Sequence, residues 1–256
     1  MVDELDDIKR QVAVANRVLA DVGLATGGTA ALGHASMRLP SDPNRFVVKG
    51  REYAVDALAV MKAEDMVVCD TEGFLVEGRP GLTQCSEIKI HSCIYKTQPA
   101  VQSVVHVHPR FTVLMTVLGV TLVPMCQEGI ELVRKPLSIY PHVKTVQSDE
   151  EGMELAALMG TDQAVLMQGH GAVTTGTTLA ESVMATMQLE EQARMNYLAY
   201  CADGRGHASV PEDLIDEMTN RTPLYELPHF KDVLQGRQPQ RSGIWNYRVV
   251  SVSQDL

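Results

Sequence analysis

Strand-type and helix-type hydrophobic patterns alternate along most of this 256-residue chain. Residues 3–22 carry apolar side chains at helical spacing, and Gly23 follows them as a typical helix-end residue. The later expected elements are strands at 35–40 and 44–50, a hairpin at 65–78, a helix from Ser86 to before Pro99, a strand at 100–108, a helix at 109–119, a strand at 121–125, a helix at 148–160, a strand at 164–176 and a helix at 178–200. Mixed elements in this order predict a three-layer α/β sandwich with antiparallel pairing early in the sheet.

Composition narrows the kind of partner. The formal net charge of −10 disfavours nucleic acid or an anionic membrane, because both reward clustered Lys and Arg. No apolar run is long enough to span a membrane, and the acidic start does not resemble a signal peptide. The five cysteines form no CxxC pair and fit buried free thiols. We therefore expect a soluble cytoplasmic protein whose partner is a small molecule.

The chain is expected to form one main domain with a tail. Residues 1–203 contain all the periodic segments, whereas residues 204–256 show scattered prolines and charges. We expect this tail to pack on the body or on a neighbouring subunit. The glycine-rich segment 25–34 lacks both GK[ST] and GxGxxG in a strand-loop-helix setting, so it is expected to be a turn lining a cleft and not a nucleotide cradle.

Three histidines stand where predicted strands end. His106 and His108 are two residues apart in "SVVHVHPR", so both can face one side of a strand. His170 lies between two glycines in "LMQGHGAV". Three imidazoles could form one face of a catalytic divalent ion, with open positions for substrate. The alternative is that they are polar residues where buried strands meet loops.

Glu87 is the acidic residue that could complete such a site. It is predicted to lie in the first turn of a helix, where a carboxylate also gains stability from the helix dipole without any other role. His91 shares its helix face four residues later. No HExxH motif is present, which disfavours a zinc protease.

Four segments together resemble the class II aldolase/adducin family. They are "GHASMR" (33–38), "CSEIKIH" (85–91), "HVHP" (106–109) and "QGHGAV" (168–173). The resemblance covers about residues 8–203 and implies an αβα sandwich around a mixed, largely antiparallel sheet. It also implies a homotetramer with active sites between subunits. It further implies that His106, His108 and His170 bind one zinc or manganese ion per subunit, with Glu87 as fourth ligand or base.

The family resemblance predicts a carbon–carbon lyase. A divalent ion on adjacent oxygens of a hydroxy-carbonyl substrate stabilises the negative charge that forms when a neighbouring carbon bond breaks. Glu87 would then take or hold a proton near the ion. Sugar-phosphate aldolases use a tyrosine as proton donor after this region, and this chain offers Glu128 or Tyr140 instead. Either residue has an equally ordinary reading, as a loop acid or a packing aromatic.

The family resemblance also implies which residues would contact the substrate. The residues that would face the substrate are His34, Ser36, Arg38, Lys49, Gly50, Cys85 and Ser86. His34, Lys49 and Cys85 stand where sugar-phosphate members carry asparagine, threonine and serine. Lys49 and Arg38 would suit a carboxylate as well as a phosphate. The GHxSxR form resembles the hydroxyaryl-acid decarboxylase branch.

The sequence does not distinguish between two reactions. One is decarboxylation of a hydroxy-aromatic or oxo acid, and the other is aldol cleavage of a small hydroxy-carbonyl compound. A metal-dependent sugar-phosphate 4-epimerase is an alternative with the same ion. A non-catalytic adducin-like binding module is the alternative outside enzymes, and the intact set of three histidines disfavours it.

Overall fold

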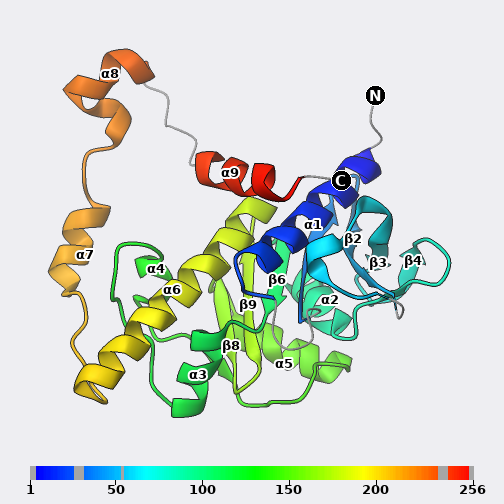
Figure 1. Cartoon of the computed structure of the whole chain (residues 1–256), viewed down its shortest axis with the longest axis horizontal. Coiled ribbons are helices and arrows are strands. Elements are labelled where there is room, and N and C mark those ends of the chain that lie inside the picture. Colours follow the sequence, from blue (N-terminus) through cyan, green and yellow to red (C-terminus); the bar gives the residue numbers. More distant parts are fainter. Residues whose placement is uncertain (1–3, 26–31, 53–54, 236–241, 254–256) are drawn as a thin grey trace.

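A computed structural model describes residues 4–25, 32–52, 55–235 and 242–253, and Figure 1 shows their arrangement. The expected glycine-rich turn falls mostly on residues 26–31, which lie outside the described residues. The helices are α1 (Glu4–Asp21), α2 (Ile88–Thr97), α3 (Arg110–Leu118), α4 (Ile130–Val133), α5 (Asp149–Met159), α6 (Leu179–Asp203), α7 (Glu212–Thr219), α8 (Pro228–Leu234) and α9 (Ser242–Val252). The strands are β1 (Gly33–Leu39), β2 (Asp42–Arg51), β3 (Met66–Asp70), β4 (Leu75–Glu77), β5 (Thr83–Gln84), β6 (Ser103–Val107), β7 (Ile139–Tyr140), β8 (Ala164–Met167) and β9 (Gly171–Gly176).

The strands form a nine-stranded sheet in the order β4-β3-β2-β1-β6-β9-β8-β7, with β5 paired to β2 outside this path. The β7–β8 pair is parallel, and the other pairs are antiparallel. This confirms the expected mixed, largely antiparallel sheet. It also places β6, the histidine strand, near the centre.

Helices cover both faces of the sheet, as Figure 1 shows. On one face, α1 and the first part of α6 pack against alternate residues of β6, including Val105 and Val107. On the other face, α2 and α5 pack against Val104. Strand residues alternate between the two faces, so His106 shares the α2 side with Val104. The three-layer αβα sandwich predicted from the sequence is confirmed.

A carboxylate from α6 fixes the segment that follows the histidine strand. Glu190 accepts hydrogen bonds from the backbone N–H groups of Phe111 and Thr112, both at 2.9 Å, and from the Thr112 hydroxyl at 2.8 Å. These amides belong to the first turn of α3, whose N–H groups have no partner within the helix. Glu190 therefore anchors the start of α3, and with it the chain immediately after His108.

The predicted strand at 121–125 is wrong. This segment is irregular because amide side chains of α6 replace a neighbouring strand. Asn196 accepts from the Val123 N–H at 3.0 Å and donates to the Val123 carbonyl at 2.8 Å. Gln192 accepts from the Met125 N–H at 3.0 Å. Buried backbone groups need partners, and here distant side chains supply them.

Two further boundaries differ from the sequence prediction. The single strand expected at 164–176 is an antiparallel hairpin of β8 and β9, with residues 168–170 as its turn. The helix expected to begin with a Ser86 cap begins at Ile88, and Glu87 is its N-cap residue without a side-chain cap hydrogen bond. The Glu87 carboxylate is engaged elsewhere, as described below.

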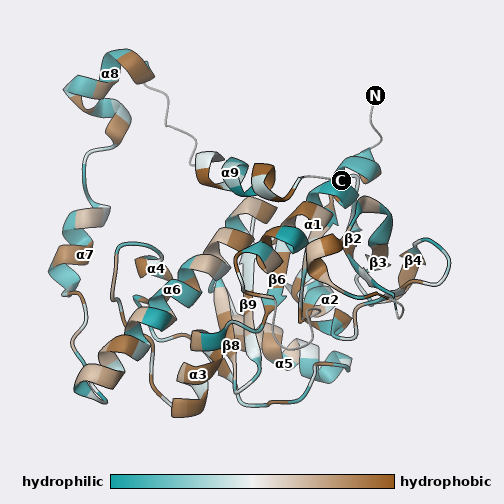
Figure 2. Cartoon of the chain, in the orientation of Figure 1, coloured by the Kyte–Doolittle hydropathy of each residue, from teal (hydrophilic) through white to brown (hydrophobic). Residues whose placement is uncertain are grey.

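The segment after Asp203 packs on the body in some parts and extends away from it in others. Trp245, Val249 and Val252 of α9 pack against the core beside α1, and Ile215 of α7 is buried. Helices α7 and α8 extend from the body in Figure 1, and Figure 2 shows hydrophobic and hydrophilic residues mixed along them. Val233 of α8 is 80% exposed. Among the described residues, no helix is both long and apolar enough to cross a membrane.

Candidate metal centre

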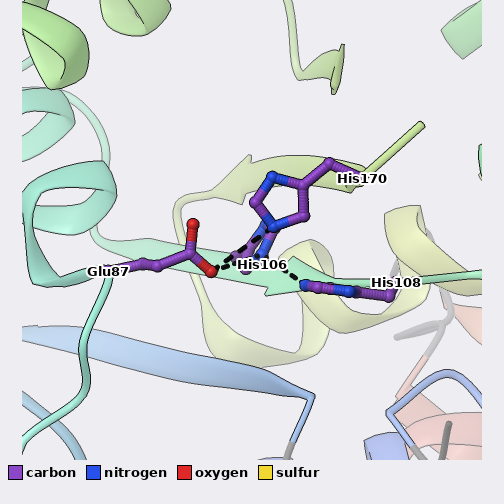
Figure 3. A group of neighbouring side chains, drawn as sticks. All are labelled: Glu87, His106, His108 and His170. Carbon is purple, nitrogen blue, oxygen red and sulfur yellow. Dashed lines mark hydrogen bonds and ion pairs between the residues drawn. The ribbon is translucent and has the colours of Figure 1, made fainter. Parts of the chain in front are cut away.

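Glu87 and three histidines meet at one end of the sheet, as Figure 3 shows. His106 is on β6, His108 lies just beyond its end, and His170 lies in the β8–β9 turn. Glu87 comes from the start of α2. One donor atom from each residue lies within 4.8 Å of the others. The sequence prediction that these four residues converge agrees with this geometry.

The distances within the group are short. His106 Nε2 lies 3.0 Å from His108 Nε2 and 3.3 Å from Glu87 Oε2. The same carboxylate oxygen lies 3.5 Å from His170 Nε2. His106 is fully buried, and Glu87 and His170 are 5% and 6% exposed. Four potential ligand atoms therefore face one another in a space from which water is largely excluded.

The hydrogen bond behind the His106 ring shows which of its nitrogens faces the group. His106 Nδ1 lies 3.1 Å from the Ala172 carbonyl oxygen. A carbonyl only accepts, so Nδ1 carries a hydrogen, and Nε2 is the nitrogen left for a proton or a metal ion. Nε2 lies beside another imidazole nitrogen and a carboxylate oxygen. A backbone carbonyl behind the ring is also the usual partner of a metal-binding histidine.

A carboxylate and three imidazole nitrogens this close together are stable only when positive charge, from protons or from a metal ion, lies among them. His170 Nδ1 is buried without a hydrogen-bond partner among the described residues, and its Nε2 lies 3.5 Å from Glu87 Oε2. Three imidazole nitrogens and one carboxylate oxygen are ligands that zinc and manganese accept. The residues present therefore fit a divalent ion.

Glu87 is held ionised and in place. Its Oε1 accepts a hydrogen bond from the Val146 N–H at 3.0 Å, which leaves Oε2 toward the histidines. Burial opposes ionisation, but the His106 and His170 rings outweigh it and hold the pKa of Glu87 well below its usual range. Burial also lowers the pKa of His108 to about 3, so this ring stays neutral and available as a ligand at ordinary pH.

The glycines beside His170 have defined geometric roles. A Cβ atom on Gly171 would lie 2.3 Å from the Val107 carbonyl oxygen and 3.1 Å from His106 Cε1. Gly169 adopts a positive φ of 61°, which side-chain-bearing residues rarely adopt. Both glycines thus let the turn bring His170 close to the end of β6.

A second histidine group lies beside the first. His34 is paired with His106 across β1 and β6, and their ring centroids are 5.2 Å apart. His34 Nδ1 lies 2.6 Å from His91 Nε2, and His91 Nδ1 lies 2.6 Å from Ser36 Oγ. Ser36 Oγ also lies 2.8 Å from the Tyr95 hydroxyl. His34 and Ser36 were expected near the substrate, whereas His91 and Tyr95 were not assigned a role.

The two predicted cations have other partners. Every guanidinium nitrogen of Arg38 donates to main-chain carbonyls, including those of Val101, Pro43 and Tyr95. Lys49 is buried and forms an ion pair with Asp56 at 2.5 Å. Arg38, which was expected to face the substrate, uses its guanidinium hydrogen bonds within the fold.

The other predicted substrate contacts divide into two kinds. Cys85 is buried within 4.8 Å of His34 and His91, and burial raises the pKa of its thiol. Gly50 is a buried β2 residue whose added Cβ would lie 2.4 Å from the Asp65 carbonyl. Ser86 is exposed. Only Cys85 of these three adjoins the histidines.

Neither predicted proton donor joins the four-residue group within one chain. Glu128 is exposed, and its backbone carbonyl accepts from Gln192 Nε2 at 2.7 Å. Tyr140 is fully buried on β7, and β8 separates it from β9. Its hydroxyl has no hydrogen-bond partner among the described residues. The structure does not bring Tyr140 to the site, because this phenol is enclosed by the α2-side core.

Comparison with known proteins decides the family. The family model described as "Class II Aldolase and Adducin N-terminal domain" matches residues 10–197. The chain belongs to the class II aldolase/adducin family. The resemblance predicted from four short segments is thus confirmed, and it covers most of the chain. Enzymes of this family depend on a divalent metal, which agrees with the donor set described above.

Two kinds of lyase are similar in sequence to this class II aldolase family member. A 3,4-dihydroxyphthalate decarboxylase of Terrabacter sp. strain DBF63 is 31% identical over 215 residues, which are 80% of this chain and 87% of that protein. An L-fuculose phosphate aldolase of Methanococcus vannielii is 29% identical over 148 residues, which are 57% of this chain and 76% of that protein. The relatives therefore support an enzyme of the lyase type.

Solved structures of the family share this fold. An aldolase II superfamily protein from Pseudomonas syringae matches with a TM-score of 0.78 and 18% identity, over 99% of this chain and 94% of that one. An L-fuculose 1-phosphate aldolase from Glaciozyma antarctica matches with a TM-score of 0.73 and 21% identity, over 98% and 90%. At these identities the likeness is evidence for the fold alone.

Proposed function

We propose that this protein is a divalent-metal-dependent carbon–carbon lyase that decarboxylates a hydroxy-aromatic acid. The observation that carries the proposal is the convergence of ligand atoms on His106 Nε2, which lies 3.0 Å from His108 Nε2 and 3.3 Å from Glu87 Oε2. The sequence relatives favour decarboxylation, because the 3,4-dihydroxyphthalate decarboxylase aligns over 80% of the chain and the fuculose phosphate aldolase over 57%. The substrate class is accordingly a vicinal dihydroxy aromatic carboxylate.

The metal would be held by His106, His108 and His170, with Glu87 as fourth ligand or as base. When bound, zinc or manganese supplies Lewis-acid stabilisation of negative charge on substrate oxygens. Glu87 is held by the Val146 N–H with Oε2 toward the histidines, so this oxygen is placed to accept a proton from a substrate hydroxyl. Loss of carbon dioxide leaves an electron pair on the ring carbon, and that carbon must then receive one proton.

Residues of the second histidine group suit the remainder of the substrate. His34 lies next to His106, and Cys85 lies beside His34. The charge of Lys49 is already balanced by Asp56. A small anionic molecule is therefore expected to be recognised by neutral hydrogen-bond donors more than by a free cation. Glu128, as an exposed carboxylate, would have to act across a subunit interface to serve as proton donor.

A homotetramer with active sites at subunit interfaces is part of the proposal. Val117 and Val143 are 61% and 66% exposed. Their side chains flank Gly169, at 3.5 and 3.2 Å from where its Cβ would stand, so an apolar surface lies beside His170. A neighbouring subunit would bury this surface, and the segment 204–256 would pack on the body or on such a neighbour. Light scattering of the purified protein measures the assembly.

The reaction is tested with substrates of both relative types. Purified protein loaded with zinc or with manganese is incubated with 3,4-dihydroxyphthalate, and carbon dioxide release is measured. L-fuculose phosphate serves as the second substrate, with detection of the aldol cleavage products. The His106→Ala protein is the negative control.

Carbon dioxide release by the loaded wild type alone supports the decarboxylase. Aldol cleavage without decarboxylation would favour the second candidate, for which the fuculose phosphate aldolase relatives are the evidence. Stereochemical scrambling of a sugar phosphate without cleavage would indicate an epimerase. A fully metal-loaded protein that transforms none of these classes would count against a lyase.

A further inference from the structure

Four buried side chains form a hydrogen-bonded chain that ends beside the metal centre. His34 and Ser36 are two residues apart on β1, and His91 and Tyr95 are four residues apart on α2. The links are Tyr95 hydroxyl to Ser36 Oγ at 2.8 Å, Ser36 Oγ to His91 Nδ1 at 2.6 Å, and His91 Nε2 to His34 Nδ1 at 2.6 Å. None of the four is more than 5% exposed.

Tyr95 determines which atom donates in each hydrogen bond of the chain. Its hydroxyl is buried, and Ser36 is its only side-chain hydrogen-bond partner among the described residues. A buried hydroxyl hydrogen without an acceptor is costly, so Tyr95 donates to Ser36. Ser36 then has one hydrogen to donate and two neighbouring acceptors. His91 Nδ1 is 2.6 Å away, whereas the Val104 carbonyl is 3.4 Å away, too long for a good O–H···O bond.

The remaining protons follow from this choice. His91 accepts at Nδ1, so its hydrogen is on Nε2 and is donated to His34 Nδ1. His34 accepts at Nδ1, so its own hydrogen is on Nε2. Each ring is neutral in this chain, because each accepts a hydrogen bond at Nδ1 and so carries its single hydrogen on Nε2.

The outer end of the chain lies beside the metal centre. His34 Nε2 has no hydrogen-bond partner among the described residues, in contrast to His34 Nδ1 and both nitrogens of His91. The His34 ring lies 5.2 Å from the His106 ring, measured between centroids. A substrate oxygen at the metal centre is therefore the natural acceptor for the His34 Nε2 hydrogen.

We propose that His91 is a positioning residue which, with Ser36 and Tyr95 behind it, holds His34 in the Nε2–H tautomer as a neutral hydrogen-bond donor. The ligand it would take is an anionic oxygen, a carboxylate or phenolate of the substrate. This rests on the proposed function, since it specifies how that same site recognises its substrate. His34 fixed in this way is a donor and not a general base.

The first test is independent of activity. In zinc-loaded protein with ring-¹⁵N-labelled histidine, the ¹⁵N resonances of the imidazoles report which nitrogen carries the hydrogen. The His34 and His91 signals are assigned by their loss in His34→Gln and His91→Gln. Hydrogen on Nε2 of both rings is expected. Hydrogen on Nδ1 of either ring overturns the proposal, whatever reaction the protein catalyses.

The second test compares two replacements of His91. Glutamine can accept from Ser36 and donate to His34, whereas leucine can do neither. Binding of 3,4-dihydroxybenzoate, the product left when 3,4-dihydroxyphthalate loses its 2-carboxylate, to zinc-loaded protein is measured by calorimetry, with zinc content determined in each variant. His91→Leu is expected to weaken binding at least tenfold, and His91→Gln less than threefold, at unchanged zinc content.

The outcomes of the two tests separate the claims. Equal binding by His91→Leu and wild type would overturn the positioning role. Failure of wild type to bind the acid would count against the proposed substrate, while the tautomer measurement would still decide the hydrogen-bonded chain. If His91→Leu does not fold, the ¹⁵N measurement on wild type remains decisive.

Discussion

Two groups of buried histidines lie side by side in this protein, and they differ in how their ring nitrogens are paired. In the chain from Tyr95 to His34, each close pair of polar atoms can be matched as one donor and one acceptor. In the group around Glu87, His106 Nε2 lies against another imidazole nitrogen and a carboxylate oxygen, and Nδ1 already donates to a carbonyl. The first group satisfies its own hydrogen bonds, whereas the second gathers atoms that can all serve as metal ligands.

This contrast separates structural histidines from ligands better than burial does. His91 and His106 are both fully buried, and both have one ring nitrogen bonded to a neighbouring oxygen. They differ at the other nitrogen. His91 Nε2 lies against a single neighbour, His34 Nδ1, whereas His106 Nε2 lies against both an imidazole nitrogen and a carboxylate oxygen. Experiments that remove one group and spare the other test this distinction.

The largest expected effect is that of His106→Ala. Loss of the central ligand should reduce bound metal to well below one ion per chain and reduce turnover by about a thousandfold, because a bound ion supplies several kcal/mol of transition-state stabilisation. Elemental analysis and a rate measurement report the two effects. His91→Gln should keep one ion per chain. Equal metal contents in these two variants would contradict the division between the groups.

Glu87→Gln should separate chemistry from metal retention. The amide oxygen can still accept from the Val146 N–H, so the local fold is expected to persist. The three imidazoles should retain at least part of the metal, while turnover falls roughly 10²- to 10⁴-fold with the loss of the base. Metal content and turnover measured on the same sample decide this. An active Glu87→Gln enzyme would remove this residue from the mechanism.

Chelation should destabilise the protein measurably. A ligand present at a thousand times its dissociation constant stabilises the native state by about 4 kcal/mol, which corresponds to roughly 10 °C in a protein of this size. Thermal unfolding with and without chelator, followed by zinc addition, measures the shift. His91→Gln should show the same shift as wild type. His106→Ala should show almost none.

Lowering the pH should reduce the folding stability of the protein, and the buried His91 should contribute to this loss. Burial lowers the pKa of His91 to about 3, whereas an unfolded histidine has a pKa of about 6.5. The unfolded state therefore binds the extra proton between these values, and stability falls as the pH falls through this window, by up to about 1.4 kcal/mol per pH unit. Urea unfolding of metal-free protein at several pH values measures the slope. His91→Gln should reduce it by about one proton, and an unchanged slope would contradict the burial of a neutral ring.

Tyr140→Phe should have the smallest effect. The Tyr140 hydroxyl is buried and has no hydrogen-bond partner in the described part of the chain, so its removal should leave stability unchanged or raise it by up to about 1 kcal/mol. Turnover should stay within about twofold of wild type. Thermal unfolding and a steady-state rate measure both quantities. A large loss of rate with normal stability would restore Tyr140 as the proton donor expected from the sequence.

The sequence predicted the ligand group because its signals are local. The spacing of His106 and His108 on a strand, and the glycines around His170, are visible within a few residues. The hydrogen-bonded chain was missed because it depends on β1 lying beneath α2, a contact between residues more than 50 positions apart. The spacing of His34 with Ser36, and of His91 with Tyr95, was the available hint, since each pair shares one face of its element.

The wrong strand at 121–125 has a similar origin. Its apolar residues predicted a strand correctly as a pattern, but a strand also needs backbone partners. Those partners are amide side chains of Gln192 and Asn196, about 70 residues further along the chain. Local sequence reports the tendency of a segment to extend, and it does not report what will bond to it.

Gly171 has a consequence for how relatives of this protein are compared. A methyl group at this position would collide with the Val107 carbonyl and crowd His106, so the hairpin carrying His170 would have to move away from β6. A homologue could thus keep all four coordinating residues and still lose the ion through one alanine that coordinates nothing. An inventory of ligands alone would misjudge such a sequence, and the empty space beside the imidazole belongs in the motif as much as the imidazole does.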